Sequence, residues 1–466
     1  MEMAGIPTVL LARTDFLGVI RNAVCGLGFP PETPLVSFPV DLFLPESDLT
    51  TVRARRQEFY EALTGWTPSR DYAAAGTGTP LVTVSAETHE QTFDRANALM
   101  LASTWGDGLP VRPPTPERVD WILRGTQLPR TQLIGKFPPR GALATVEACA
   151  IALAMAGGRP EYLPVLIAAV EAFLDPRSGG QSLQADSGSA YPVVVVNGPI
   201  SRQIRLNTSF GCLGPDPQRP AGASIGRALR LMQQNLGGAL PGVGAMGMWG
   251  AMRYTNAVFG EDEAGLPEGW TPHGADRHGY APGTNCVSLV FATGATNIRR
   301  RGFGGESREV DALQGMRRTA KYLRSPNLGC LMGWSRGTPG VLLLSPIVAK
   351  AMTELGWTKD SIRTFLWEHT RIPADELALD GIDTWIRLDH DPAVRASIAL
   401  DPWPMSSRPE NLVVIIAGGG HPTNSYWLES YGPEVVGKTI SVPDGFDALL
   451  KEADRELGCG EEVCMI

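Results

Sequence analysis

Acidic and imidazole side chains gather in one segment of the chain, where they could carry acid–base chemistry. The run Gly260-Glu261-Asp262-Glu263 comes shortly before His273 and His278. Carboxylates and imidazoles placed close together can divide the roles of general acid and base, or ligate a divalent metal. We therefore expect Glu261, Glu263 and His273 to be catalytic, with His273 and Glu263 as the ligands if a metal is used. A solvated acidic turn would give the same pattern.

A second polar group follows the apolar run Val193–Val196, which stops at Asn197. The next loop contains Cys212, and a helix is expected to open at Ser224. Asparagine amides and an arginine fork suit a carboxylate or amide substrate, although the same side chains also stabilise loops. Cys212, within this loop, is the candidate for a catalytic thiol. The alternative is that it is a buried, inert cysteine. The side chains expected here to bind substrate are Asn197, Asn207, Thr208 and Arg227.

A third candidate follows the apolar run Leu412–Ala417, where the sequence continues Gly418-Gly419-Gly420-His421. Glycines after a buried strand let the backbone approach a ligand and offer N–H groups to an anion. We expect Gly419 and His421 to contact substrate and close the pocket. A tight turn carrying a surface histidine is the alternative. Neither a Walker sequence nor a dinucleotide fingerprint is present.

The second and third groups share one position, the end of an apolar segment that is typical of a buried strand. Apolar runs alternate with helical patterns along the whole chain, which indicates an α/β protein with mostly parallel, buried strands. In such folds ligands bind where the ends of strands meet, so we expect one cleft between two α/β parts. No internal repeat is visible. The expected later strands are Val193–Val196, Val287–Phe291, Gly340–Leu344 and Leu412–Ala417.

The domain organisation follows from a change in composition near residue 70. Residues 1–68 are expected to form a small N-terminal α/β module, 69–80 a linker, 81–450 the main α/β domain or domains, and 451–466 a mobile tail. The first strand, Gly5–Ala12, leaves little chain to cover the edge of its sheet. Because an uncovered edge usually has a partner, the module is expected to be incomplete by itself.

Bulk properties exclude several classes of protein. Hydrophobic residues make up 43% and charged residues 19%, which is ordinary for a globular protein. A net charge of -8 argues against nucleic-acid binding. There is no apolar run long enough to span a membrane and no secretory signal at the N-terminus, so no membrane association is expected. Seven cysteines without a Cys-x-x-Cys pair favour a reducing cytoplasm.

The sequence contains five long motifs, residues 107–119 (DGLPVRPPTPERV), 144–147 (ATVE), 155–164 (MAGGRPEYLP), 196–199 (VNGP) and 224–231 (SIGRALRL). Together they resemble a known family, the UGSC-type (seleno)proteins. The resemblance covers most of residues 80–445, including 340–349 and 417–419. The first seventy residues resemble that family's N-terminal module, which is itself similar to the substrate-activating selenoprotein subunits of glycine and proline reductases.

The resemblance implies reductive or carbon–heteroatom bond-cleaving chemistry through a thiol or selenol, but this chain departs from the family in two places. It lacks the Cys/Sec-Gly-Ser-Cys segment that precedes the first strand in relatives. It also has Gly158 where relatives often carry cysteine. Either the nucleophile has been lost, or a small companion subunit supplies the missing N-terminal strand and its cysteines. The bare sheet edge favours a companion subunit.

Three functions remain open from the sequence. The leading one is an oligomeric cytoplasmic enzyme, an oxidoreductase or lyase acting on a small polar metabolite, and the large subunit of a heteromer. The second is a metal-dependent hydrolase or lyase that uses no thiol. The third is a non-catalytic subunit that binds substrate or acts as a scaffold for a partner.

Overall fold

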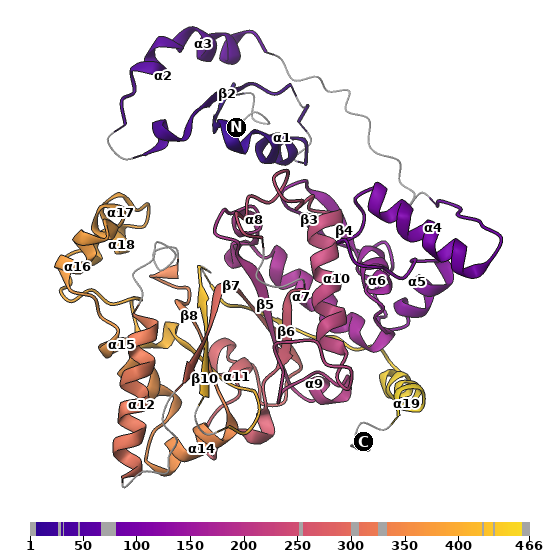
Figure 1. Cartoon of the computed structure of the whole chain (residues 1–466), viewed down its shortest axis with the longest axis vertical. Helices are drawn as coiled ribbons and strands as arrows, with labels where there is room; N and C mark the ends of the chain where they lie inside the picture. Colours follow the sequence, from indigo (N-terminus) through magenta and orange to yellow (C-terminus); the bar gives the residue numbers. More distant parts are fainter. Residues whose placement is uncertain are drawn as a thin grey trace.

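The computed structural model describes residues 6–26, 29–30, 32–44, 47–66, 81–250, 255–299, 307–324, 333–421, 424–431 and 434–458. It confirms the general α/β class (Figure 1). The expected linker at 69–80 lies outside the described residues, as do Cys459 and Cys464. None of the helices among the described residues is long and apolar enough to cross a membrane.

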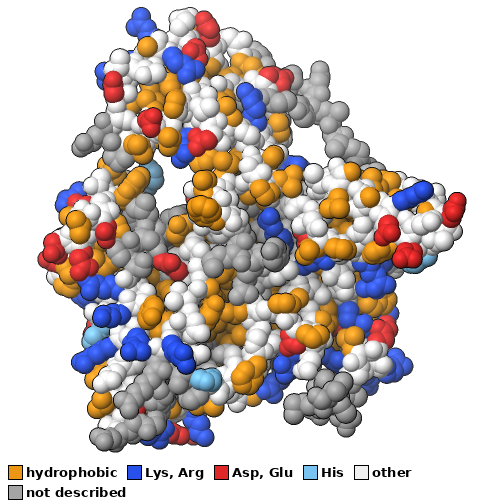
Figure 2. Space-filling view, viewed as in Figure 1, with side chains coloured by type: hydrophobic (Ala, Val, Ile, Leu, Met, Phe, Trp, Pro, Cys, Tyr) orange, Lys and Arg blue, Asp and Glu red, His pale blue; other side chains and the backbone are white. Residues whose placement is uncertain are grey.

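The N-terminal module contains a sheet of two described strands. Strand β1 (Leu10–Arg13) pairs in parallel with β2 (Leu35–Phe38), and α1 (Leu17–Gly26) connects them. Helices α2 (Thr50–Ala54) and α3 (Arg56–Thr64) follow. Few side chains are buried here, and apolar side chains remain on the module's surface, with Leu11 half exposed and Tyr60 63% exposed (Figure 2).

The main body is built on a curled sheet that has seven strands in the described residues. Its order is β6-β5-β7-β10-β8-β9, and β11 pairs with the beginning of β7. The strands are β5 (Tyr191–Asn197), β6 (Ala257–Gly260), β7 (Cys286–Arg299), β8 (Gly340–Leu344), β9 (Val413–Ile416), β10 (Asn424–Ser430) and β11 (Val436–Thr439).

The expectation of mostly parallel strands holds only in part. Within this sheet β5 and β6 are parallel, as are β8 and β9. The pairings of β7 with β5, β10 and β11, and of β10 with β8, are antiparallel. The observed sheet differs from the expected one because β7 runs antiparallel to β5, and β10 runs antiparallel to β8. The sheet is therefore mixed.

The sheet contains a repeat of topology that the sequence does not reveal. Strand β5 lies between a parallel neighbour, β6, and an antiparallel neighbour, β7. In the same way, β8 lies between the parallel β9 and the antiparallel β10. The two halves meet between β7 and β10. The sheet curls so far that its edges also meet, because the Asp262 N–H donates to the Ile416 carbonyl oxygen at 2.7 Å.

Three apolar cores hold the curled sheet. Side chains from one face of β5–β10 form the core inside the curl. The other face packs against helices, with α6, α7 and α10 covering the first half and α12, α14 and α15 the second (Figure 1). These helices are α6 (Val146–Met155), α7 (Leu163–Leu174), α10 (Ala221–Asn235), α12 (Arg308–Leu323), α14 (Pro346–Glu354) and α15 (Lys359–His369).

The remaining elements lie around this body. Helix α10 begins three residues before the expected Ser224, so Ser224 does not cap it. Helix α19 extends past residue 450, where the mobile tail was expected to begin. The elements are α4 (His89–Ala102), α5 (Pro116–Leu123), the hairpin β3 (Leu133–Phe137) and β4 (Ala142–Thr145), α8 (Gly180–Leu183), α9 (Ile200–Gln203), α11 (His273–His278), α16 (Ala374–Leu379), α17 (Ile382–Leu388), α18 (Pro392–Ser397) and α19 (Phe446–Leu457).

Candidate functional site

The ends of four strands come together where the two edges of the sheet meet. Backbone bonds extend both parallel pairs by one residue: Glu261 N–H donates to Val196 O at 3.1 Å, and Ala417 N–H donates to Leu344 O at 3.0 Å. Glu261 and Ala417 thus hold equivalent positions in the two halves of the sheet. The Asp262–Ile416 bond then joins the two positions. The predicted convergence of strand ends is therefore found here, and only the first half carries a carboxylate at this point.

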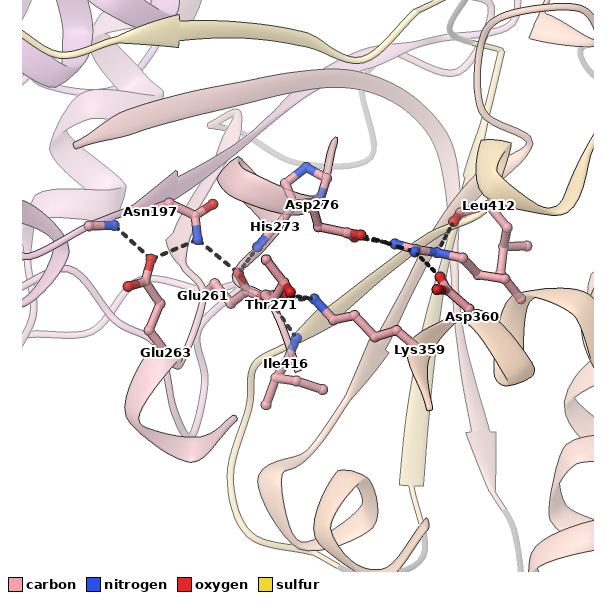
Figure 3. Close-up of polar contacts among 12 residues, drawn as sticks. Asn197, Glu261, Glu263, Thr271, His273, Asp276, Lys359, Asp360, Leu412 and Ile416 are labelled. Atoms are coloured by element: carbon pink, nitrogen blue, oxygen red, sulfur yellow. Dashed lines mark hydrogen bonds and ion pairs between the residues drawn. The ribbon is translucent and has the colours of Figure 1, made fainter. Parts of the chain in front are cut away.

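Glu261 is the centre of this junction. Its carboxylate is fully buried and accepts hydrogen bonds from four separate segments (Figure 3). Such charge-assisted bonds offset the cost of taking the carboxylate out of water. The donors are Asn197 Nδ2 at 2.7 Å, His273 N at 2.5 Å, Ile416 N at 3.4 Å and Lys359 Nζ at 3.5 Å.

Asn197 links the two carboxylates. Besides Glu261, its Nδ2 donates to Glu263 Oε1 at 2.8 Å, and the same oxygen accepts the Gly198 N–H at 2.7 Å. Gly198 has a φ of +90°, and a Cβ there would lie 2.6 Å from Asn285 Oδ1. Glycine is thus required at the turn that aims this N–H at Glu263. The second oxygen of Glu263 accepts no hydrogen bond from the described residues.

Three buried polar atoms in this cluster have no hydrogen-bond partner among the described residues. They are Asn197 Oδ1 and both ring nitrogens of His273, which is 1% exposed. Buried polar atoms are almost always paired, so each unpaired one requires an explanation. Burial, reinforced by His278, Lys359 and two arginines, holds the pKa of His273 well below its usual range. The ring is therefore neutral at pH 7, with one nitrogen able to donate and the other able to accept.

His278 and Cys286 form the next layer. The rings of His273 and His278 lie 5.8 Å apart, and His278 Nε2 is 2.9 Å from Ser288 Oγ. Burial, followed by Arg277 and Arg177, lowers the pKa of His278 to about 4. A Cβ at Gly274 would lie 2.6 Å from Cys286 Sγ and 3.4 Å from Asn197 Cβ. Burial and the charges of Glu263 and Glu261 raise the pKa of Cys286 to about 12, so its thiol stays protonated.

Sequence reasoning did not find Lys359 or Cys286. Lys359 is 5% exposed and also donates to Thr271 O at 2.7 Å. It begins α15 and is separated from Glu261 by 98 residues, so no local pattern signals the contact. Cys286 was missed because it directly precedes an apolar run, a pattern that is typical of a cysteine in the core. A second ion pair, Arg363 with Asp276, continues the line of polar contacts from α11 to α15 (Figure 3).

The described residues contain no group of three or more His, Cys, Asp or Glu side chains placed to hold a metal ion. Catalytic zinc sites normally take three protein ligands. A divalent metal held by His273 and Glu263 stays a prediction, and these two would need ligands from elsewhere.

The loop after α9 lies against the same strand ends, but Asn207 uses its side chain within the loop. Its Nδ2 donates to Phe210 O at 2.8 Å and Asp216 Oδ2 at 3.0 Å, and its Oδ1 accepts the Ser209 N–H at 2.9 Å. Its carbonyl oxygen accepts the Gly260 N–H at 3.0 Å, at the end of β6. Asn207 therefore shapes the loop and fixes it to the junction.

Thr208 joins this loop to the glycine-rich segment, because its carbonyl oxygen accepts the Gly418 N–H at 2.9 Å. A Cβ at Gly419 would overlap the ring of Phe210, so glycine there permits close packing with the loop. His421 is exposed, and its carbonyl oxygen accepts the Ser345 hydroxyl at 3.0 Å. Cys212 is buried and packs in the core inside the curl.

Arg227 is engaged elsewhere. Its guanidinium makes a bidentate ion pair with Asp107, at 2.8 Å for each bond, and also donates to the carbonyls of Leu109 and Pro110. Burial favours the neutral form of Asp107, but Arg227 outweighs it and holds the pKa of that carboxyl below its usual value. Arg227 therefore clamps the segment after α4 to α10 and makes no contact with the Asn197–Glu261–Glu263 cluster.

We compared the chain with known proteins at the level of family, sequence and structure. Protein-family models, curated proteins and solved structures gave no match. The resemblance to the UGSC-type family therefore stays a prediction.

Proposed function

We propose that this chain is an enzyme that acts on a small polar metabolite at the Asn197–Glu261–Glu263–His273 cluster. The observation that carries the proposal is the set of unpaired buried atoms, Asn197 Oδ1 and the two His273 nitrogens, beside two carboxylates. Protein interiors rarely keep such atoms unpaired unless a ligand, a reaction or an ordered water uses them. The ends of strands are also where α/β proteins commonly bind small molecules.

The contacts suggest a division of roles. Glu263 is the acid–base group, because one of its oxygens is held by Asn197 and Gly198 while the other has no described partner. Glu261 is a positioning residue, since its carboxylate is saturated by donors from four segments. Asn197 Oδ1 would accept a hydrogen bond from the substrate. Neutral His273 would pass a proton through its two free nitrogens.

The reaction class comes from the family resemblance: reductive or carbon–heteroatom bond cleavage, with this chain as the large subunit of a cytoplasmic heteromer. A small companion subunit would add a strand to the β1–β2 sheet and bring the thiol. The two-stranded sheet and half-exposed Leu11 support this arrangement, because so small a sheet buries little apolar surface. The burial of Cys212 and the protonated state of Cys286 make either of these two thiols a weaker option as the nucleophile.

The third reading, a non-catalytic subunit, draws support from Glu261 itself. A carboxylate that ties together four segments can be wholly structural. The metal-dependent alternative stays open through His273 and Glu263.

One experiment separates the enzymatic readings from the non-catalytic one. Native complex would be incubated with a pool of small polar metabolites, and depletion would be followed by mass spectrometry. Glu263→Gln should abolish turnover of the metabolite consumed by the wild type. Glu268→Gln, the same change on an exposed side chain nearby, should leave turnover intact. Turnover by the wild type that Glu263→Gln leaves unchanged would refute the assignment, and no turnover of any metabolite would favour the non-catalytic subunit.

A further inference from the structure

A cavity lies at the opposite end of β5 from Asn197. Tyr191 begins this seven-residue strand and Asn197 ends it. At about 3.3 Å per residue the two are about 20 Å apart. The cavity has a volume of about 50 Å³, and Tyr191 and Pro192 form part of its wall. Since one water needs about 10–15 Å³ of such space, the cavity suits a molecule of a few heavy atoms.

Arg230, on α10, lines this cavity without a partner. Its guanidinium makes no hydrogen bond or ion pair with any described residue, whereas Arg227 on the same helix is fully paired with Asp107. Burial lowers the pKa of Arg230, and only the charge of Asp107 opposes this. Asp186 also lines the cavity, but its Oδ1 accepts the Gly188 N–H and no ion pair joins it to Arg230. A partly buried guanidinium without a counter-ion among the described residues is an anchor for an anion.

Gln184 supplies a second unsatisfied group in the same wall. Its Nε2 donates to the Pro138 carbonyl oxygen, which fixes the orientation of the amide. Its Oε1 is then buried and accepts no hydrogen bond from the described residues, although the side chain is only 6% exposed. An acceptor in this state calls for a donor on the ligand.

The rim of the cavity has two further features of a built site. Ser189 has a φ of +61°, a strained conformation for a residue other than glycine, and its Oγ accepts the Trp249 N–H at 3.4 Å. The loop that contains Trp249 also meets the N-terminal module: a Cβ at Gly238 would lie 2.8 Å from Asn22 Nδ2. Residues 236–250 therefore include part of the cavity wall, such as Pro241, and also lie close to α1.

We propose that this cavity binds a small carboxylate that also carries a hydrogen-bond donor. The carboxylate pairs with Arg230, whose planar fork matches it in a bidentate manner. The donor, a hydroxyl or an amino group, satisfies Gln184 Oε1. This site is separate from the Asn197–Glu261–Glu263 cluster and does not depend on the role proposed for that cluster.

Calorimetric titration of the full chain with sodium glycolate and sodium acetate tests the proposal. Both should bind, and glycolate should bind more tightly because acetate lacks the hydroxyl donor. Arg230→Met should weaken glycolate binding at least about tenfold. The matched control is Arg317→Met, which removes the same charge from an exposed position on α12. Arg317→Met and Glu263→Gln should both bind glycolate as the wild type does.

Two results would overturn the proposal. One is the absence of saturable binding of either salt to folded wild-type protein, and the other is unchanged glycolate affinity in Arg230→Met. If Arg230→Met fails to fold, Arg230→Lys keeps the charge but loses the bidentate fork. That variant should bind glycolate more weakly than the wild type, and equal binding would contradict the role of Arg230.

Discussion

The side-chain amide of Asn197 donates to the buried carboxylate of Glu261 at 2.7 Å, which joins the end of β5 to the end of β6. Since Glu261 also accepts the backbone N–H of Ile416, the same carboxylate connects the first half of the sheet to the second. The proposed acid–base centre therefore coincides with the junction that closes the curled sheet, so substitutions there are expected to affect stability as well as activity.

Replacing Glu261 with Gln should lower the free energy of unfolding by about 3 kcal/mol, because it leaves the Lys359 ammonium buried without its counter-charge. Denaturant unfolding followed by circular dichroism measures the change. Glu268→Gln, at an exposed position, should stay within about 0.5 kcal/mol of the wild type. Equal stability of the two variants would mean that Glu261 does not hold the junction.

Replacing Asn197 with Asp places a third carboxylate between Glu261 and Glu263. The repulsion should destabilise the protein by at least about 2 kcal/mol at pH 8. The deficit relative to the wild type should shrink as the pH is lowered to 5, because protonation of one carboxyl relieves the repulsion. Asn197→Ala loses the hydrogen bonds without adding charge, so its deficit should change less with pH. A pH-independent deficit for Asn197→Asp would contradict the close approach of these groups.

The depressed pKa of His278 predicts a loss of stability in acid. The unfolded chain takes up a proton near the ordinary pKa of 6.5, whereas the folded form resists until about pH 4. The contribution is therefore complete above pH 7 and is lost as the pH falls from about 6.5 towards 4. His278→Gln should remove about 2 kcal/mol of the stability difference between pH 7.5 and pH 5. Unfolding midpoints at the two pH values measure it, and identical pH dependence in both proteins would count against it.

The clamp between Arg227 and Asp107 gives a prediction that separates structure from function. Arg227→Met leaves the buried Asp107 carboxylate unpaired and should cost about 3 kcal/mol of unfolding free energy. Asp107→Asn combined with Arg227→Met should recover part of that loss, as a double-mutant cycle would show. Ligand binding at the Asn197 cluster should be unchanged in folded Arg227→Met. Loss of binding at that cluster would show that Arg227 contributes to the substrate site.

Local sequence signals predicted many single elements correctly. Strand β8 has the predicted bounds Gly340–Leu344, and β5 (Tyr191–Asn197) contains the whole predicted run Val193–Val196. These features depend on neighbouring residues, so a short window of sequence contains them. Strand β6 was missed because it has only four residues and ends in Gly260, which weakens a strand pattern.

The features that the sequence did not predict depend on contacts between residues that lie far apart in the chain. The grouping of Asn197 with Glu261 and Glu263 was expected because the polar groups were predicted to line one cleft. Arg227 was misplaced because its partner lies 120 residues away, in a segment with no periodic pattern. The mixed sheet likewise depends on the direction in which β7 and β10 return, and apolar runs do not encode direction.

Ligand-observed NMR of the native protein with a library of small polar metabolites tests whether the Asn197–Glu261–Glu263–His273 cluster binds substrate. At least one metabolite should bind the wild type and Glu268→Gln alike, and should bind folded Glu263→Gln at least about tenfold more weakly. Metabolites that lose binding only in Arg230→Met would report the separate cavity at the other end of β5. If every metabolite that binds the wild type binds folded Glu263→Gln equally well, the cluster is not the substrate site.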